Sequence, residues 1–327
     1  MNKFIKIIML LFILFILPGC SNSKTSTTEN IKSNSEVKIN DNKLYNINKS
    51  DIINMLCSDE FEGRLVGSRG NQLAEKYIAD KFNEIKLEYV FNKSFYQTYK
   101  QVNVANMSDE LIEVNNIIGK ISGTNSKKAI VISAHLDHIG FKNENIIRGA
   151  VDNASGISVL IDLASKFKEH IQTNTPQYDI IFCAFNGEEK GLFGSKAFIE
   201  AIEGEYDNIY NINIDSIGYE NGGNIILANS YQLAGNTIDS ESYILFLDML
   251  KKSFNTNLLT VSDSIIHVKS DDYSFQEKDI TTITITEENI WDVIHTPNDI
   301  PEILDYNKLD LISNSIYDFI LEFLNNI

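Results

Sequence analysis

The sequence predicts one α/β domain built on a mixed, mainly parallel β-sheet with helices on both faces. From about residue 47 onward, apolar strand-like segments alternate with amphipathic helical segments, which is the pattern of parallel strands joined by crossover helices. The segment YDIIFCAF at 178–185 is apolar throughout, as expected of a strand that is buried on both faces. The remaining length of about 280 residues suits one large domain, and no internal repeat is evident.

The predicted elements follow one another in a regular order. Ser50 is expected to cap a short helix, and a longer helix begins at about Asn71, after a loop that is rich in glycine. Apolar runs predict strands at 115–121, 129–133, 178–185, 209–214, 224–229 and 280–286. Helical spacing of apolar residues predicts further helices at 154–171, 192–202, 240–254 and 308–324.

The N-terminus is typical of a bacterial lipoprotein signal peptide. Lys3 and Lys6 precede an apolar run that is shorter than the roughly 20 residues needed to span a bilayer, and the run ends in LPGC. We therefore expect residues 1–19 to be removed and Cys20 to carry lipid, which would anchor the protein to the outer face of the cell membrane. Residues 20–46 are rich in Ser, Thr, Asn and Lys and are expected to form a flexible tether to a folded domain at 47–327.

Charge and cysteine content limit the partners and the cross-links. The formal net charge of −17 argues against a nucleic-acid partner. Cys57 and Cys183 are expected to be unpaired core residues, although a disulfide between them remains open for an exported protein. The oligomeric state is not indicated by the sequence.

Acidic and histidine side chains follow the predicted strands at the points where the strands end. In a parallel sheet these ends meet at one edge, where ligands bind. A lone acid in such a place is more often a helix or turn cap than a ligand, but a whole group at one edge reverses that expectation. The group comprises His135 and Asp137 after the strand at 129–133, Glu188 and Glu189 after 178–185, Asp215 after 209–214, His295 after the last strand, and Asp152 at the start of a helix.

The donor atoms of this group favour zinc or a similar divalent ion. They are imidazole nitrogens and carboxylate oxygens, with no sulfur among them. Two histidines and three carboxylates suffice for two ions if one carboxylate bridges them. Asp137 could accept the N–H of His135 that faces away from the metal. His138, His170 and His267 receive no role.

Five segments of the sequence carry a resemblance to a known family. In this order and with these gaps, they resemble the di-zinc peptidase family that contains bacterial leucyl aminopeptidase, aminopeptidase Y and glutamate carboxypeptidase II, with the similarity running from EGRLVGSRGN at 62–71 to the end of the domain. The segments are SAHLDHIG, RGAVDNASGISVL, FNGEEKGLFGS, NIDSIG and HTPNDI. The resemblance implies a zinc-peptidase or phosphorylase-like fold and a zinc-dependent exopeptidase, an aminopeptidase acting on peptides with a free N-terminus.

The resemblance also implies a role for each residue of the group. Asp152 would bridge two zinc ions, with His135 and Asp215 completing one ion and Glu189 and His295 completing the other. Asp137 would be the partner of His135. Glu188 would be the general base, removing a proton from the attacking water and delivering it to the leaving amine.

One departure and several alternatives accompany this resemblance. Some relatives carry a tyrosine before the last histidine ligand, where this chain has Ile294, which is expected to line a side-chain pocket with Ser216 nearby. One alternative is an enzyme similar to glutaminyl cyclase, which shares the fold but binds one zinc ion. A second is a carboxypeptidase, for which only Arg64, Arg69 and Arg148 offer guanidinium groups. A third is a non-catalytic binding protein on the same scaffold.

Overall fold

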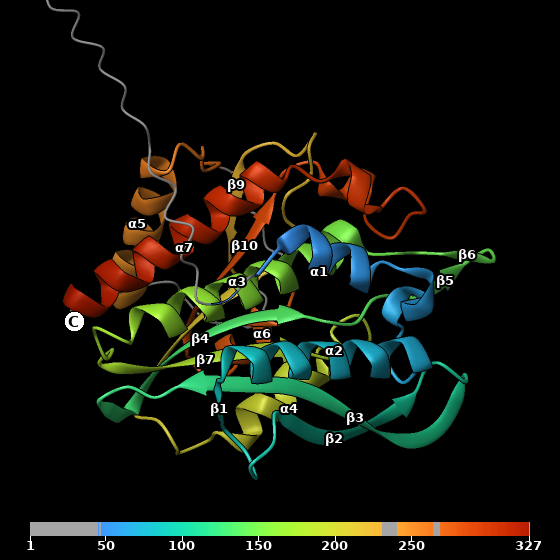
Figure 1. Ribbon diagram of the computed structural model, residues 1–327, viewed down its shortest axis with the longest axis horizontal. Helices are drawn as coiled ribbons and strands as arrows, with labels where there is room; N and C mark the ends of the chain where they lie inside the picture. Colours follow the sequence, from blue (N-terminus) through green and yellow to red (C-terminus); the bar gives the residue numbers. More distant parts are fainter. Residues whose placement is uncertain (1–44, 46, 231–240, 264–268, 327) are drawn as a thin grey trace, which may run out of the picture. The chain divides into compact units, whose positions relative to one another are not determined.

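A mixed eight-stranded sheet forms the centre of the computed structural model, which describes residues 45, 47–230, 241–263 and 269–326 (Figure 1). The expected signal peptide at 1–19 and Cys20 lie outside the described residues, as does all of the expected tether at 20–46 except Tyr45. The described residues fall within one compact unit, Lys43–Ile327. No helix among them is both long and apolar enough to cross a membrane.

Four parallel strands make up the middle of the sheet, and the sequence predicted all of them. They lie in the order β7 (Tyr178–Phe185), β4 (Asn125–His135), β8 (Asn208–Ile214) and β10 (Thr281–Glu287). The register places Ile132 of β4 opposite Phe182 on one side and Ile212 on the other. Because the four strands run in one direction, the residues that follow them are brought to one edge of the sheet.

Antiparallel strands extend the sheet on both sides. Strand β3 (Ser108–Ile121) pairs with β7 and carries β1 (Glu88–Tyr89) and β2 (Tyr96–Asn103), while β9 (Ile225–Ala228) pairs with β10. The sequence prediction missed β2, because the buried side chains of this strand are Gln97, Gln101 and Asn103 and therefore give no hydrophobic alternation. It also missed a small hairpin of β5 (Phe141–Lys142) and β6 (Asn145–Ile146).

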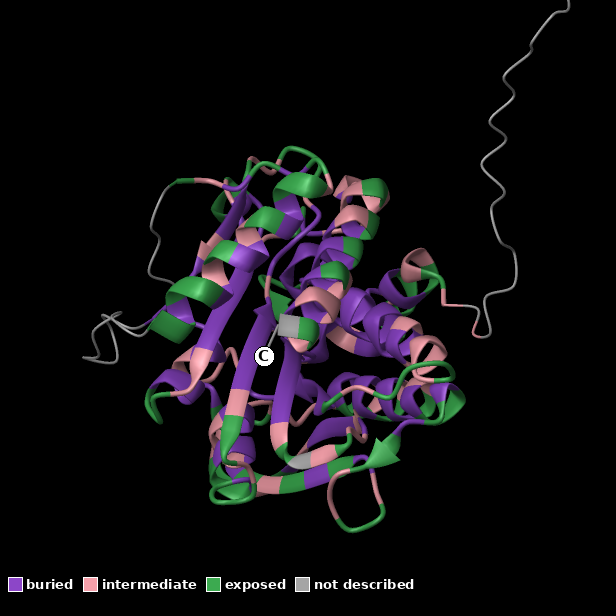
Figure 2. Ribbon diagram, turned by 90° about the vertical axis from the view of Figure 1, so that its left-hand side faces the viewer, coloured by how far each residue is buried: buried purple, intermediate pink, exposed green. Residues whose placement is uncertain are grey.

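Helices cover both faces of the sheet, as predicted. One apolar core joins one face of the sheet to α1 (Lys49–Leu56), α2 (Arg69–Ile85), α3 (Ser155–His170), α5 (Glu241–Thr256) and α7 (Tyr306–Asn326). A smaller core joins the other face to α4 (Phe193–Ala201) and the short α6 (Asp272–Gln276), which the sequence did not predict. Along β4, Ile130 and Ile132 belong to the first core and Val131 to the second, and the four central strands are buried over most of their length (Figure 2).

The cap of α1 differs from the sequence prediction, whereas the two cysteines agree with it. The cap of α1 is Asn48 and not Ser50: the side chain of Asn48 accepts a hydrogen bond from the Ser50 amide at 3.0 Å. The helix starts earlier than expected because Asn48 has the extended backbone of a cap residue. Cys57 and Cys183 are both buried and unpaired, as predicted.

Candidate active site

The residues predicted to form the site do meet at one edge of the sheet. His135 ends β4, Glu188 and Glu189 follow β7, and Asp215 follows β8. Two sets of donor atoms lie there, each within 4.8 Å of one another, and both include Asp152. One set is His135, Asp152 and Asp215, and the other is His138, Asp152, Glu189 and His295.

The first set surrounds one nitrogen of the His135 ring. His135 Nε2 lies 3.2 Å from Asp152 Oδ1 and 3.3 Å from Asp215 Oδ1. The other ring nitrogen, Nδ1, lies 3.2 Å from the backbone carbonyl of Asp137 but 3.9 Å from its carboxylate. The partner expected to be the Asp137 carboxylate is therefore the carbonyl of the same residue. This contact leaves His135 Nε2 as the nitrogen that faces the carboxylates.

The second set lies around Oδ2 of Asp152 and Oε1 of Glu189. His295 Nε2 lies 3.0 Å from Asp152 Oδ2 and 2.9 Å from Glu189 Oε1. His138 Nδ1 lies 3.0 Å from the same Glu189 oxygen and 3.7 Å from Asp152 Oδ2. The two oxygens of Asp152 thus face different sets, with Oδ1 toward His135 and Oδ2 toward His295.

Hydrogen bonds to its backbone hold Asp152 in place. The amides of Val151 and Asp152 donate to the Asp299 carboxylate at 2.6 and 3.3 Å. The side chain of Asn153 donates to the Ile214 carbonyl at 2.8 Å and accepts from the Ser216 amide at 3.3 Å. Asp152 is therefore fixed to the segment after β8, which carries Asp215.

Sequence reasoning gave no role to several residues that position the site. Asp299 belongs to the quoted segment HTPNDI, so its place in that segment was the available signal. Ser270 donates to Asp215 Oδ2 at 2.6 Å, and it precedes a helix that was not predicted. His138 was present in SAHLDHIG, but an isolated histidine carries no sign of the direction in which its ring points.

The turn that carries Glu188 and Glu189 is held by the carboxylate of Asp137. The amides of Glu188 and Glu189 donate to the two oxygens of Asp137 at 3.1 and 3.3 Å. Gly187 precedes them with φ 74°, a conformation that favours glycine. Asp137 therefore orients both glutamates as well as contacting His135 through its carbonyl.

The two neighbouring glutamates have pKa values that are shifted in opposite directions. Burial raises the pKa of Glu188 well above its usual range; His135 opposes this rise, and Asp215 adds to it. Burial and Asp152 would also raise the pKa of Glu189, but hydrogen bonds with His138 and His295 outweigh them and lower it to about 2. Such a separation is typical of a pair in which one carboxyl carries protons and the other stays ionised.

The site fits a borderline divalent cation such as zinc. Its donors are imidazole nitrogens and carboxylate oxygens, the ligands that zinc accepts in hydrolytic sites. Burial opposes ionisation of Asp152, yet the surrounding histidines lower its pKa well below the usual range. Hydrogen bonds with Asp152 and Glu189 raise the pKa of His295 to about 10. The carboxylates therefore attract positive charge strongly, which is the electrostatic condition of a cation site.

A pocket of about 340 Å³ opens beside these residues. Ile294 and Ser216 both line it, and so do Ile290 and the exposed Trp291. Among the described residues that line it, Lys269 is the only lysine or arginine, and its Nζ lies 4.3 Å from the centre of the Tyr273 ring. The pocket lining thus combines a few apolar side chains with hydroxyl groups and with the residues of the donor sets.

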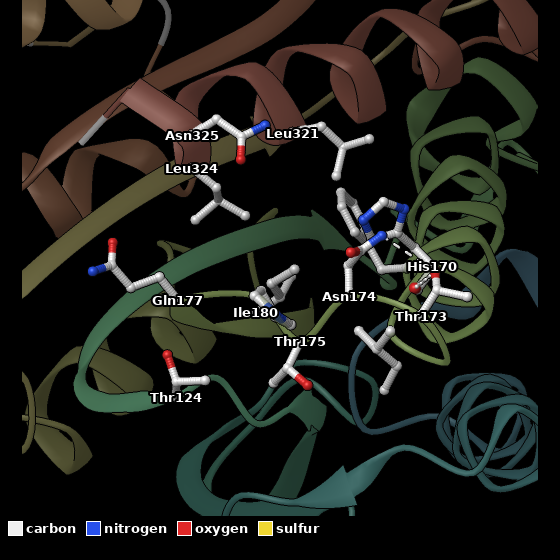
Figure 3. Close-up of a pocket in the computed structure, with 13 residues that line it drawn as sticks. Thr124, His170, Thr173, Asn174, Thr175, Gln177, Ile180, Leu321, Leu324 and Asn325 are labelled. Carbon is white, nitrogen blue, oxygen red and sulfur yellow. Dashed lines mark hydrogen bonds between the residues drawn. The ribbon is translucent and has the colours of Figure 1, made fainter.

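A larger hollow, of about 770 Å³, lies at the opposite edge of the sheet, near the starts of β4 and β7 (Figure 3). Its lining is threonine, asparagine, glutamine and apolar side chains, and His170 is the only titratable residue among the described residues that line it. Nδ1 of His170 lies 3.0 Å from the hydroxyl of Tyr317. This hollow is larger than the pocket beside the acids, but no group of acids that could bind a metal or move a proton lines it in the described part of the chain.

The fold and the site together define an α/β protein that has two adjoining sets of nitrogen and oxygen donors at the carboxyl edge of its sheet. The chain belongs to peptidase family M28, whose family model matches residues 116–320.

Individual proteins are similar to this chain in sequence or in fold. Aminopeptidase YwaD of Bacillus subtilis is 27% identical over 215 residues, which cover 62% of this chain and 44% of that protein. The solved structure of a zinc aminopeptidase from Bacillus subtilis matches 84% of this chain and 94% of its own, with a TM-score of 0.66 and 14% identity. Glutaminyl cyclase from Fimbriiglobus ruber matches 84% of this chain and 95% of its own, with a TM-score of 0.67 and 14% identity. The fold alone therefore does not separate peptidase from cyclase.

The chain spans only part of its curated relatives. It covers 25%, 47% and 27% of the length of three that it matches.

Proposed function

We propose that this chain is a zinc aminopeptidase that removes the N-terminal residue of peptides with the help of two ions. One observation carries the proposal: the two oxygens of Asp152 face two different donor sets, 3.2 Å from His135 and 3.0 Å from His295. Asp152 would bridge the ions, His135 and Asp215 would hold one, and Glu189 and His295 would hold the other. When bound, zinc supplies Lewis acidity that activates water and polarises a carbonyl.

Glu188 is the proton carrier in this proposal. Its carboxyl lines the pocket, and its raised pKa suits a group that takes a proton from the attacking water and gives it to the leaving amine. Asp137 contributes by fixing the Glu188 amide at 3.1 Å. Glu189, directly beside it, keeps a low pKa of about 2 and so remains an ionised ligand.

A free α-amine of the substrate has suitable partners in this site. It could lie against Asp215 or approach one ion as a neutral nitrogen ligand, whereas an N-acetyl group would remove that donor. The first side chain would enter the pocket lined by Ile294 and Ile290, so an apolar residue such as leucine is favoured. Ser216 at the same pocket makes the lining less uniformly apolar.

A comparison of four substrates tests the reaction. Leucine p-nitroanilide should be cleaved, while its N-acetyl form and a peptide with a blocked N-terminus and a free C-terminus should not. Efficient release of the C-terminal residue from the blocked peptide would replace the proposal with a carboxypeptidase. Ring closure of an N-terminal glutamine peptide, the fourth substrate, would replace it with an activity like that of glutaminyl cyclase.

We also propose that the mature protein is anchored outside the bacterial cell by lipid on Cys20. The support is the charged start, the short apolar run and the LPGC sequence. Cys20→Ala should release the protein from the membrane fraction or prevent its processing. A Cys20→Ala protein that is processed and stays membrane-bound like the wild type would contradict this proposal.

A further inference from the structure

His138 is a fully buried imidazole at the centre of the site that the bridged two-ion proposal leaves without a role. Its backbone amide donates to the Arg64 carbonyl at 3.2 Å, which fixes the start of the side chain. Gly149 packs directly against the ring: a methyl group at Gly149 would lie 2.7 Å from two ring carbons of His138. The ring therefore has one defined orientation, with Nδ1 toward the carboxylates.

The position of His138 resembles that of His295, which is a proposed ligand. Both rings present a nitrogen to Glu189 Oε1, at 3.0 Å for His138 and 2.9 Å for His295. Both also approach Asp152 Oδ2, but His138 is farther away, at 3.7 Å against 3.0 Å. The ring centroids lie 5.4 Å apart. Distance alone allows His138 to be either a further metal ligand or a hydrogen-bond donor to Glu189.

The second nitrogen of the ring decides between these two roles. A ligand through Nδ1 would need its proton on Nε2, and a ligating histidine almost always donates that proton to a partner. His138 Nε2 is buried and has no hydrogen-bond partner among the described residues. As a ligand, His138 would therefore lack the partner that fixes the tautomer of most metal-binding histidines. His135 differs, because its Nδ1 has the Asp137 carbonyl at 3.2 Å and its Nε2 is free to bind metal.

We infer that His138 is a positioning residue that donates a hydrogen bond from Nδ1 to Glu189 and does not bind the metal itself. The hydrogen bond holds the Glu189 carboxylate in the direction that the second ion requires. This inference rests on the two-ion function proposed above. His138 should affect binding of only the ion that Glu189 would hold. Among the described residues, His138 has no contact with His135 or Asp215, which would hold the other ion.

Amide side chains separate the donor role from the ligand role. The amide nitrogen of asparagine reproduces the place of Nδ1, whereas that of glutamine reproduces Nε2. In the zinc-loaded full chain, His138→Leu should weaken binding of one zinc ion by about 10- to 100-fold in a chelator competition, as loss of an outer partner does elsewhere. His138→Asn should recover most of this affinity, and His138→Gln should not.

The matched control is His170→Asn, which changes a histidine that bonds Tyr317 at the opposite edge of the sheet. It should leave both zinc affinities unchanged. The inference would be overturned if His138→Asn bound zinc no more tightly than His138→Leu, or if His138→Leu kept the zinc affinity of the wild type. Thermal unfolding of each variant checks that its fold is intact. Wild-type protein that binds only one ion would instead contradict the two-ion proposal, and the leucine and asparagine comparison would still report on Glu189.

Nuclear magnetic resonance of the ring nitrogens gives an independent reading. In ¹⁵N-histidine-labelled, zinc-loaded protein, His138 should show a proton on Nδ1 and no metal-induced shift of either ring nitrogen. A metal-induced shift of Nδ1, with no proton on that nitrogen, would mean that Nδ1 binds the ion, which is the rejected role.

Discussion

The two edges of the central sheet differ in chemistry more than in shape. At the carboxyl edge, two donor sets share Asp152 beside a pocket of about 340 Å³. At the amino edge, the larger hollow of about 770 Å³ has one titratable residue, His170, in its described lining (Figure 3). Parallel strands thus bring reactive groups together where they end, whatever the size of the cavity. We expect function to follow the charged edge.

The largest effect is expected from Glu188→Gln. This change removes the proton carrier but no proposed metal ligand, so kcat should fall by at least about 10²- to 10⁴-fold while zinc content is kept. Glu189→Gln is the matched variant, since it alters the neighbouring residue and should lose zinc. Kinetics and elemental analysis of both proteins check the assignment. Zinc loss in the Glu188 variant with retention in the Glu189 variant would reverse the two roles.

Asp299→Asn should weaken zinc binding without removing a ligand. The Asp299 carboxylate accepts from the amides of Val151 and Asp152, and an amide side chain would lose one of these acceptors. We expect a loss of about 10- to 100-fold in zinc affinity, measured by chelator competition. Glu302→Gln, an exposed change three residues further along the chain, is the control and should have no effect. Equal affinities in both variants would show that Asp299 does not position the site.

The sequence was sufficient to predict the parallel core and the candidate residues around it. Apolar strands such as 178–185 and the acids after them depend on local patterns, and parallel topology then brings these acids together. Strand β2 could not be found because its inward face is made of glutamine and asparagine. Such a strand is stabilised by side-chain partners from distant parts of the chain: Gln97, for example, accepts from Asn116 at 2.9 Å.

The fine arrangement of the site was also beyond the sequence. Nothing in the segment SAHLDHIG distinguishes the carbonyl of Asp137 from its carboxylate as the partner of His135. The ring direction of His138 depends on Gly149 and Arg64, which are distant in the chain. Long-range packing, which local patterns do not encode, sets these contacts.

A buried ion pair far from the donor sets should affect stability and leave catalysis unchanged. Burial would raise the pKa of Asp162, but Lys49 and Lys166 outweigh it and lower that pKa to about 2, below its ordinary value of 3.8. Because the folded-state pKa is the lower one, the stabilisation is present above about pH 4 and is lost as the pH falls toward 2. Asp162→Asn should lower the free energy of unfolding by about 1–3 kcal/mol at neutral pH.

The control for Asp162 is Asp310→Asn. Asp310 bonds the same Lys49 at 2.6 Å, but its side chain is 63% exposed. Exposed ion pairs contribute about 0–1 kcal/mol, so this variant should unfold nearly like the wild type. Denaturant unfolding between pH 2 and 7 checks both variants. A stability difference for Asp162→Asn that does not shrink as the pH falls would contradict the assignment.

The smallest effect is expected at the amino edge of the sheet. Thr175→Tyr should fill part of the larger hollow. Thr175 is exposed, and exposed substitutions usually change little. We therefore expect kcat/KM for leucine p-nitroanilide to stay within about twofold of wild type. A large loss of kcat/KM in a folded Thr175→Tyr protein would place substrate at the amino edge and would remove the contrast between the two edges.

The number of zinc ions per chain tests the bridged two-ion site most directly. Zinc is added back to the metal-free wild-type protein while its zinc content, by elemental analysis, and its peptidase activity are followed. Because the two oxygens of Asp152 face two separate donor sets, we expect two ions per chain, with full activity reached only when both are bound. A single ion with full activity, and no gain on further zinc, would contradict the bridged two-ion site and would favour a single-zinc enzyme on the same fold.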